Sequence, residues 1–162
     1  MKKIKKMISI AVLTIILLIT VFSLPVLSWF KEQHGLVDGK LKPCNSTENC
    51  VCSENYSNRN LDSFSLAGAP ADIVWQSLAD IISTRGGEIR VLENKYLWAT
   101  YTSKWMRFMD DFEARLDLDA GVIQIRSSSR VGRSDFGVNR RRVEDIVNEL
   151  RKRLRSNTES MQ

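Results

Sequence analysis

The chain has 162 residues, with 24 basic and 19 acidic side chains and a formal net charge of +5. Four of the basic residues lie within the first six positions, so the rest of the chain is nearly neutral, with 20 basic and 19 acidic side chains. This balance argues against nucleic-acid binding, because nucleic-acid-binding domains carry a marked positive excess. Some 130 residues follow the N-terminal apolar stretch, which is enough for one domain with its own core.

Residues 1–30 differ in kind from the rest and predict a membrane anchor or signal segment. No charged residue occurs between Met7 and Phe30, and a helix needs about 20 apolar residues to cross a bilayer. Because lysine-rich flanks stay in the cytoplasm, we expect a single-pass anchor through residues 7–29 with the main domain on the extracytoplasmic side. A cleaved signal peptide is the alternative, although its apolar core is usually about 7–15 residues long and residues 24–29 offer no small-x-small cleavage pattern.

Residues 31–60 have little hydrophobic periodicity and contain Cys44, Cys50 and Cys52. We predict a tether and a cysteine-containing lead-in with one disulfide and one remaining thiol, because an exported segment meets conditions in which disulfides form. Three cysteines without a nearby histidine suit a metal poorly. His34, the only histidine, follows the membrane segment directly and is expected to lie in solvent. The sequence predicts neither a metal nor a cofactor.

The periodic part of the chain, residues 61–155, begins with a possible strand at 61–66. Pro70 fits the first position of a helix that runs to Gly86-Gly87, with apolar residues on one face at helical spacing. Strands are expected at 88–92 and 96–103, where β-branched and aromatic residues concentrate. The final helix is expected to begin with Asn139 as its N-cap, and residues 156–162 to form a flexible tail.

The segment 107–130 is expected to form a hairpin with two unlike faces. With a two-residue turn at 120–121, Leu116 opposes Ile125 on an apolar face that should cover the helices. On the other face the same register places Asp111 opposite Arg130. The whole order predicts an α+β domain, an antiparallel sheet of four to five strands with two helices packed on one face, preceded by an N-terminal transmembrane helix.

Arginines gather after residue 125, and two interpretations of them stay open. One is a site for an anionic group, since arginine forks and helix N-termini bind phosphate and carboxylate; its candidate residues are Arg126, Ser128, Arg130, Arg140 and Arg141. The other is an internal network. Its structural ion-pair candidates are Asp110, Asp111, Glu113 and Asp135. The two can coexist, because the arginines outnumber these acids.

Two functions of different classes follow. A binding or accessory module would use the arginines to recognise an anionic small molecule, a lipid headgroup or a protein partner. A hydrolase or transferase would use the Asp110, Asp111 and Glu113 carboxylates as acid or base. The binding module is favoured, because Ser127–Ser129 lack a histidine base and the sequence has no glycine-rich phosphate loop or nucleophile elbow.

Four motifs in a fixed order carry a family resemblance. They are Arg107-Phe108-x-Asp110-Asp111-Phe112-Glu113, Arg126-Ser127-Ser128-Ser129-Arg130-Val131-Gly132, Ser134-Asp135-Phe136-Gly137-Val138-Asn139-Arg140 and Cys44-Asn45-Ser46-Thr47-Glu48-Asn49-Cys50-Val51. On these motifs the chain resembles the family catalogued as domain of unknown function 1499.

The resemblance implies a membrane-attached or exported bacterial protein with relatives in plastids, and it implies no catalytic residues. It also implies that Cys44 pairs with Cys50. Two positions depart from the family pattern: Asn45 stands where the family usually has proline, and Cys52 where it usually has serine. Cys52 is therefore the cysteine left over in this reading.

Overall fold

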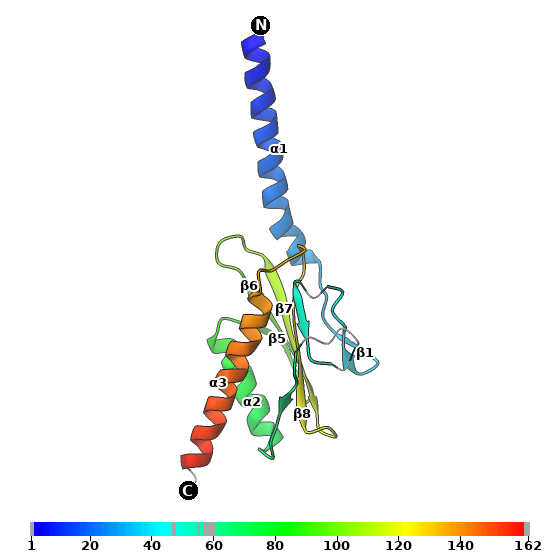
Figure 1. Cartoon of the computed structure of the whole chain (residues 1–162), viewed down its shortest axis with the longest axis vertical. Coiled ribbons are helices and arrows are strands. Elements are labelled where there is room, and N and C mark those ends of the chain that lie inside the picture. The colour runs from blue at the N-terminus through cyan, green and yellow to red at the C-terminus, as the bar shows by residue number, and fades with distance from the viewer. Residues whose placement is uncertain (1, 47, 55, 57–60, 161–162) are drawn as a thin grey trace.

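The computed structural model of the chain describes residues 2–46, 48–54, 56 and 61–160. A long N-terminal helix leads into a domain built from one large sheet and two further helices (Figure 1). The helices are α1 (Lys2–Phe30), α2 (Ala71–Thr84) and α3 (Val138–Ser160). The strands are β1 (Leu36–Val37), β2 (Lys40–Leu41), β3 (Cys50–Cys52), β4 (Phe64–Ser65), β5 (Glu88–Leu92), β6 (Tyr96–Thr102), β7 (Met109–Asp117) and β8 (Val122–Ser129).

The α+β class is confirmed, with a six-stranded sheet in place of the predicted four to five strands. The strand order is β3-β8-β7-β6-β5, β4 also pairs with β8, and every pairing is antiparallel. The extra strand, β3, comes from the cysteine-containing segment that the sequence treats as irregular. All three residues of β3 are buried, so polar and apolar side chains do not alternate along it and the sequence gives no strand pattern. Its extended conformation comes from pairing with β8.

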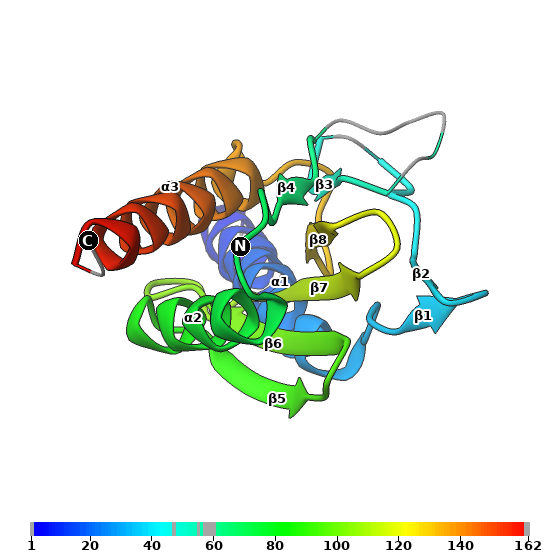
Figure 2. The same cartoon turned by 90° about the horizontal axis from the view of Figure 1, so that it is seen from below.

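Both domain helices cover the same face of the sheet, with α2 and α3 side by side (Figure 2). Their apolar stripes meet the inward residues of the central strands, among which Leu97, Phe112 and Ile125 are fully buried. Burial of such side chains stabilises a fold by about 1.5–3 kcal/mol each. After α2 the chain passes so close to this core that a Cβ on Gly87 would lie 2.6 Å from Ile82 Cγ2, which explains a glycine there.

The hairpin has the predicted faces but not the predicted register. Asp117 pairs with Val122 and Leu116 with Ile123, so the turn holds four residues, 118–121, instead of two. Asp117 Oδ1 accepts a hydrogen bond from the Ala120 N–H at 3.0 Å, and Gly121 has φ +64. The side chain of Asp117 thus stabilises the longer turn. A shift by two residues keeps every side chain on its face, so the separation into an apolar and a charged face survives.

The start and the end of α3 also differ from expectation. Asp135, not Asn139, caps the helix: its carboxylate accepts the N–H groups of Gly137 at 2.9 Å and Asn139 at 2.7 Å. The Asn139 side chain turns inward, is fully buried, and is hydrogen-bonded to Ser127 and Ser129. The helix continues to Ser160, whereas the sequence placed a flexible tail from residue 156.

The residues that follow the membrane segment are not a loose tether. α1 is the one helix among the described residues that is long and apolar enough to cross a membrane, with a mean hydropathy of 2.8 over its best window. At its end the chain bends across the sheet face opposite to α2 and α3. We call residues 28–44 the strap. His34 lies in the strap and stacks on Trp98, with ring centroids 3.4 Å apart, so its expected position in solvent was wrong. The stacking partner lies on β6, which the local sequence cannot reveal.

Candidate functional site

The charged face of the sheet lies under the strap and carries most of the residues that the sequence singled out. Side chains alternate along a strand, so one set of β6, β7 and β8 side chains points away from the helices. The strap meets them with hydrogen bonds from its backbone. Gln33 N donates to Asp111 Oδ2 at 3.4 Å, Gly35 N to Glu113 Oε1 at 2.7 Å, and Leu41 N to Glu54 Oε1 at 3.3 Å.

Asp111 and Arg130 form the pair nearest to the membrane helix. Arg130 Nε donates to Asp111 Oδ2 at 3.0 Å and Nη2 to Oδ1 at 2.7 Å, the bidentate geometry in which a guanidinium binds a carboxylate most strongly. Trp98 Nε1 donates to the same carboxylate at 2.8 Å. Arg130 Nη1 also reaches the carbonyl oxygens of Ser28 at 3.3 Å and Trp29 at 3.4 Å, and thereby ties the end of α1 to the sheet.

Glu113 and Arg126 form the second pair, at the centre of the face. Arg126 Nη1 donates to Glu113 Oε2 at 2.7 Å and to the Gln33 carbonyl at 3.3 Å. The Tyr96 hydroxyl donates to Glu113 Oε1 at 2.8 Å. Burial and the adjacent Glu113 carboxylate raise the pKa of Tyr96 well above its usual value, so this phenol is a hydrogen-bond donor throughout the physiological range.

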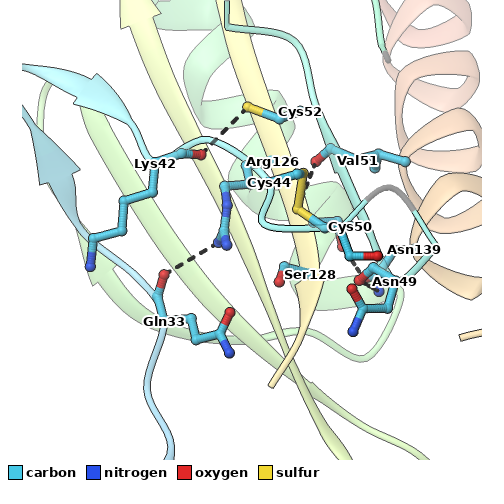
Figure 3. Close-up of a disulfide and its surroundings, with 12 residues drawn as sticks. Gln33, Lys42, Cys44, Asn49, Cys50, Val51, Cys52, Arg126, Ser128 and Asn139 are labelled. Carbon is cyan, nitrogen blue, oxygen red and sulfur yellow. Dashed lines mark hydrogen bonds between the residues drawn. A yellow bond between two sulfur atoms is a disulfide. The ribbon is translucent and has the colours of Figure 1, made fainter. Parts of the chain in front are cut away.

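Arg126 also lies beside the cysteines, as Figure 3 shows. Cys44 and Cys50 form a disulfide, and Cys52 retains its thiol in a buried position. Cys52 Sγ donates to the Lys42 carbonyl at 3.7 Å. Burial raises the pKa of Cys52 despite the nearby Arg126 guanidinium. Arg126 Nε is itself buried and has no hydrogen-bond partner among the described residues.

Two further pairs extend the network to both sides of the sheet. Under the strap, Arg115 Nε donates to the buried Glu54 at 2.7 Å. On the helix side, Arg142 Nη2 donates to Asp110 Oδ2 at 2.8 Å. The Arg142 guanidinium lies 4.4 Å from the centroid of the Tyr101 ring, a cation–π contact that helps to hold the first turn of α3 on β6 and β7.

The five candidate anion-binding residues therefore fall into two groups. Arg126, Ser128 and Arg130 are only 2–3% exposed; the two arginines hold Glu113 and Asp111, and the strap lies over this face. Arg140 and Arg141 are exposed on the first turn of α3. The four acidic candidates are also divided, since Asp110, Asp111 and Glu113 make ion pairs whereas Asp135 is a helix cap. A ligand can reach only the second group of arginines.

The sequence of the chain matches one known protein family. A family model described as "Protein of unknown function (DUF1499)" matches residues 40–150. The chain belongs to this family. No curated protein and no solved structure matches it.

In this DUF1499 domain, three of the four motifs that carry the resemblance contribute residues to the internal network or to the start of α3. The Arg-Phe-x-Asp-Asp-Phe-Glu and Arg-Ser-Ser-Ser-Arg motifs supply β7 and β8 with Asp110, Asp111, Glu113, Arg126 and Arg130. The Ser-Asp-Phe-Gly-Val-Asn motif supplies the Asp135 cap and the buried Asn139. Most of the polar residues in these motifs are therefore engaged in internal contacts and are not available on a binding surface.

Sequence reasoning missed several members of the network. Glu54, Tyr96 and Trp98 lie on the charged face, and Glu54 is 2% exposed. Tyr96 and Trp98 could have been recognised, because aromatic residues at alternate positions of a strand point to the same face. Glu54 follows β3, within a segment without periodicity. The strap gave little signal, because its contacts with Asp111, Glu113, Arg126 and Arg130 use backbone N–H and C=O groups, which any residue except proline supplies in full.

Proposed function

We propose that this DUF1499 protein is a membrane-anchored, extracytoplasmic binding or accessory module that recognises an anionic group through exposed arginines at the start of α3. The location follows from two features. Lysines precede the apolar helix, which favours a cytoplasmic N-terminus, and the Cys44–Cys50 disulfide suits an oxidising compartment. A phosphatase reporter fused after Gln162 should be active, whereas a C-terminal green fluorescent reporter should stay dark; the opposite pattern would place the domain in the cytoplasm.

One observation carries the choice of site. Asp110 binds Arg142 and Asp135 caps the helix. Arg140 and Arg141 are exposed at the start of α3, and Arg133 in the preceding loop has a side chain that is 90% exposed. Positive charge here opposes the helix dipole, which gives an anion a reason to bind. Arg140 also lines an open hollow of about 420 Å³ together with Arg151 and Asn148, although Asp62 and Glu144 line it too.

The carboxylate-based enzyme is not supported by the geometry. Asp111 and Glu113 are fully buried and each is bound by an arginine. Three open hollows formed by the described residues are lined by α3 with residues 61–69 or by residues 93–96 with 115–116. None of these three hollows is lined by Asp110, Asp111 or Glu113.

The test is a thermal-shift screen on the detergent-solubilised full chain with inorganic phosphate, glycerol phosphate, citrate and short-chain phospholipids. A ligand that binds only the folded state raises Tm, by an amount equivalent to about 2.7 kcal/mol at 100 times its Kd. The double variant Arg140→Ala with Arg141→Ala should lose the shift. The matched control, Lys152→Ala with Arg155→Ala, removes the same charge from the far end of α3 and should keep it.

The arms of the screen distinguish the sources of the anion. A shift with short-chain phospholipid but not with glycerol phosphate identifies a lipid headgroup in its membrane setting, and a shift with both identifies the phosphate itself. Absence of any shift, or equal loss in the two double variants, would contradict the proposal. Equal loss would mean that the anion responds to the total positive charge of the protein, and absence of a shift would mean that Arg140 and Arg141 have a structural role only.

A further inference from the structure

Two loops carry the most exposed aromatic side chains of the described domain, and both lie at the end where α1 enters it (Figure 1). Trp105, in loop 103–108 between β6 and β7, is 95% exposed. Phe136, in loop 130–137 between β8 and α3, is 87% exposed. Large aromatic groups left in water at two loop tips on the same end of the domain suggest a partner, since each ring would bury a large apolar area.

The loops are held in place, so the exposure is a property of the fold. In loop 103–108, Phe108 N donates to Ser103 Oγ at 2.9 Å and Ser103 N to the Phe108 carbonyl at 2.8 Å. In loop 130–137, Arg141 Nη1 donates to the Phe136 carbonyl at 2.9 Å. Phe136 has φ +54, a left-handed conformation that is strained for a bulky residue.

The level of the loops relative to a bilayer follows from α1. Its uncharged stretch, Met7–Phe30, has 24 residues and is about 36 Å long as a helix, some 6 Å more than the hydrocarbon core. The last turn of α1 therefore emerges in the headgroup layer. Trp29 lies in that turn, and its Nε1 donates to the Arg107 carbonyl of loop 103–108 at 3.0 Å.

The second loop is tied to the same level. Arg130, at the start of loop 130–137, donates to the carbonyl oxygens of Ser28 and Trp29. Ser28 Oγ in turn accepts a hydrogen bond from Met109 N at 3.0 Å, where loop 103–108 enters β7. Both loops are thus fastened to the last turn of α1, without a linker that would let the domain swing away from the membrane.

The surroundings of the two tips match a phospholipid surface. Met106 is also exposed, at 44%, next to Trp105, and the flanking Lys104 and Arg107 are exposed cations. Tryptophan prefers the membrane interface, where its ring meets apolar groups and its N–H meets water. Lysine and arginine at the same depth interact with phosphate groups. Phe136 has Arg133 beside it in its own loop.

We propose that loops 103–108 and 130–137 are seated in the interfacial layer of the membrane that α1 spans, with Trp105 and Phe136 as apolar tips. The domain then has three attachments to one leaflet, the α1 helix and two loops, which fix its tilt. This contact rests on the aromatic tips and does not depend on anion recognition by Arg140 and Arg141.

The experiment uses the full chain in phosphatidylcholine nanodiscs, with lipids brominated close to the headgroup. Tryptophan emission is compared between the wild-type protein and Trp105→Phe, and the difference spectrum belongs to Trp105. We expect this component to be blue-shifted and quenched by the brominated lipid. Trp29, Trp75 and Trp98 are common to both proteins and cancel in the difference spectrum.

The matched control moves the tryptophan to the other end of the domain. In Trp105→Phe combined with Ala120→Trp, the new ring lies in the exposed turn 118–121, distant from α1 (Figure 1). Its emission should be unaffected by brominated lipid and accessible to aqueous iodide. Phe136→Trp in the Trp105→Phe background should behave like the wild-type Trp105.

Two results would overturn the proposal. If the Trp105 component is as accessible to iodide as the tryptophan at position 120, and brominated lipid leaves it unchanged, the loops point into water. If its blue shift grows with the number of chains per nanodisc, the tips contact a second copy of the protein instead of lipid. Repeating the measurement with Arg140→Ala and Arg141→Ala separates this contact from the anion site, because lipid quenching in phosphatidylcholine should persist.

Discussion

The Asp111 carboxylate and the Arg130 guanidinium bind each other through two hydrogen bonds of 2.7 and 3.0 Å, and both side chains are buried to 98% or more. The pair does more than join two strands. Arg130 also binds backbone carbonyls at the end of α1, and Asp111 accepts an N–H from Gln33 of the strap. One ion pair therefore couples α1, the strap and the sheet.

Breaking this pair from one side should be costly. Either Asp111→Ala or Arg130→Ala leaves an uncompensated buried charge, so we expect each to lower the free energy of unfolding by about 3–5 kcal/mol. The double variant Asp111→Ala with Arg130→Met should lose less than the sum, because no isolated charge remains. The measurement is chemical denaturation of the full chain in detergent, followed by tryptophan fluorescence.

Arg133→Ala is the control for that series. Arg133 also makes an ion pair, with Glu48 at 3.2 Å, but its side chain is 90% exposed, and we expect a change within about 0.5 kcal/mol. Single variants of the buried pair that behave like Arg133→Ala would show that water reaches the charges under the strap.

The Asp135 cap gives a second prediction. Asp135→Ala removes the acceptor for two N–H groups at the start of α3 and should cost about 1 kcal/mol. Asp135→Asn keeps an acceptor oxygen and should recover most of this loss. The same denaturation measurement decides, and equal losses in both variants would mean that the carboxylate charge, not the cap, is what matters.

Alkaline stability should depend on Tyr101. Burial raises the pKa of Tyr101 to about 12, compared with about 10 in an unfolded chain. The folded state thus favours the neutral phenol, and its contribution is complete below about pH 10 and is lost as the pH rises toward 12. Tm should fall over this range, and Tyr101→Phe should show a shallower fall, measured as Tm against pH. Parallel curves for the two proteins would show that Tyr101 does not titrate with unfolding.

The cysteines should differ in reactivity. In the native protein at pH 7 the Cys52 thiol is buried and its pKa is raised by that burial, so maleimide labelling should be slow. After unfolding without reductant, one label per chain is expected, on the peptide that contains Cys52. Cys44 and Cys50 should react only after reduction. Fast native labelling, or three labels without reductant, would contradict the assignment, and Cys52→Ser provides the blank.

In the hairpin of β7 and β8, the periodicity of the sequence predicts the two faces but not the register. Alternation along β7 and β8 places Phe112 and Ile125 on one face and Glu113 and Arg126 on the other for any turn with an even number of residues, so the faces were predictable. The register was not, because the two- and four-residue turns have the same parity and only the Asp117–Ala120 hydrogen bond favours the longer one. As a consequence, Glu113 lies directly opposite Arg126, whereas Asp111 lies opposite Ser128 and reaches Arg130 diagonally instead of directly as the predicted register had it.

For the candidate site, the sequence likewise predicted which residues are involved but not which of them are buried. Composition alone pointed to the arginines after residue 125 and to the acids at 110–113, and these residues do form the charged centre of the domain. It could not tell buried from exposed arginines, since Arg130 and Arg140 look alike in a sequence. Burial of Arg130 depends on the strap, which starts about 100 residues earlier in the chain.

By itself, the sequence determined the features that arise from local repetition: an uncharged helix long enough to cross a membrane, two amphipathic helices, and strands with one apolar and one charged face. These depend on the spacing of side chains along a helix or strand. The tertiary structure alone decided which charges meet, which are covered, and which aromatic tips lie at the end of the domain that α1 enters. Such contacts join segments that are distant in the chain, here through backbone groups of the strap that carry no side-chain signature.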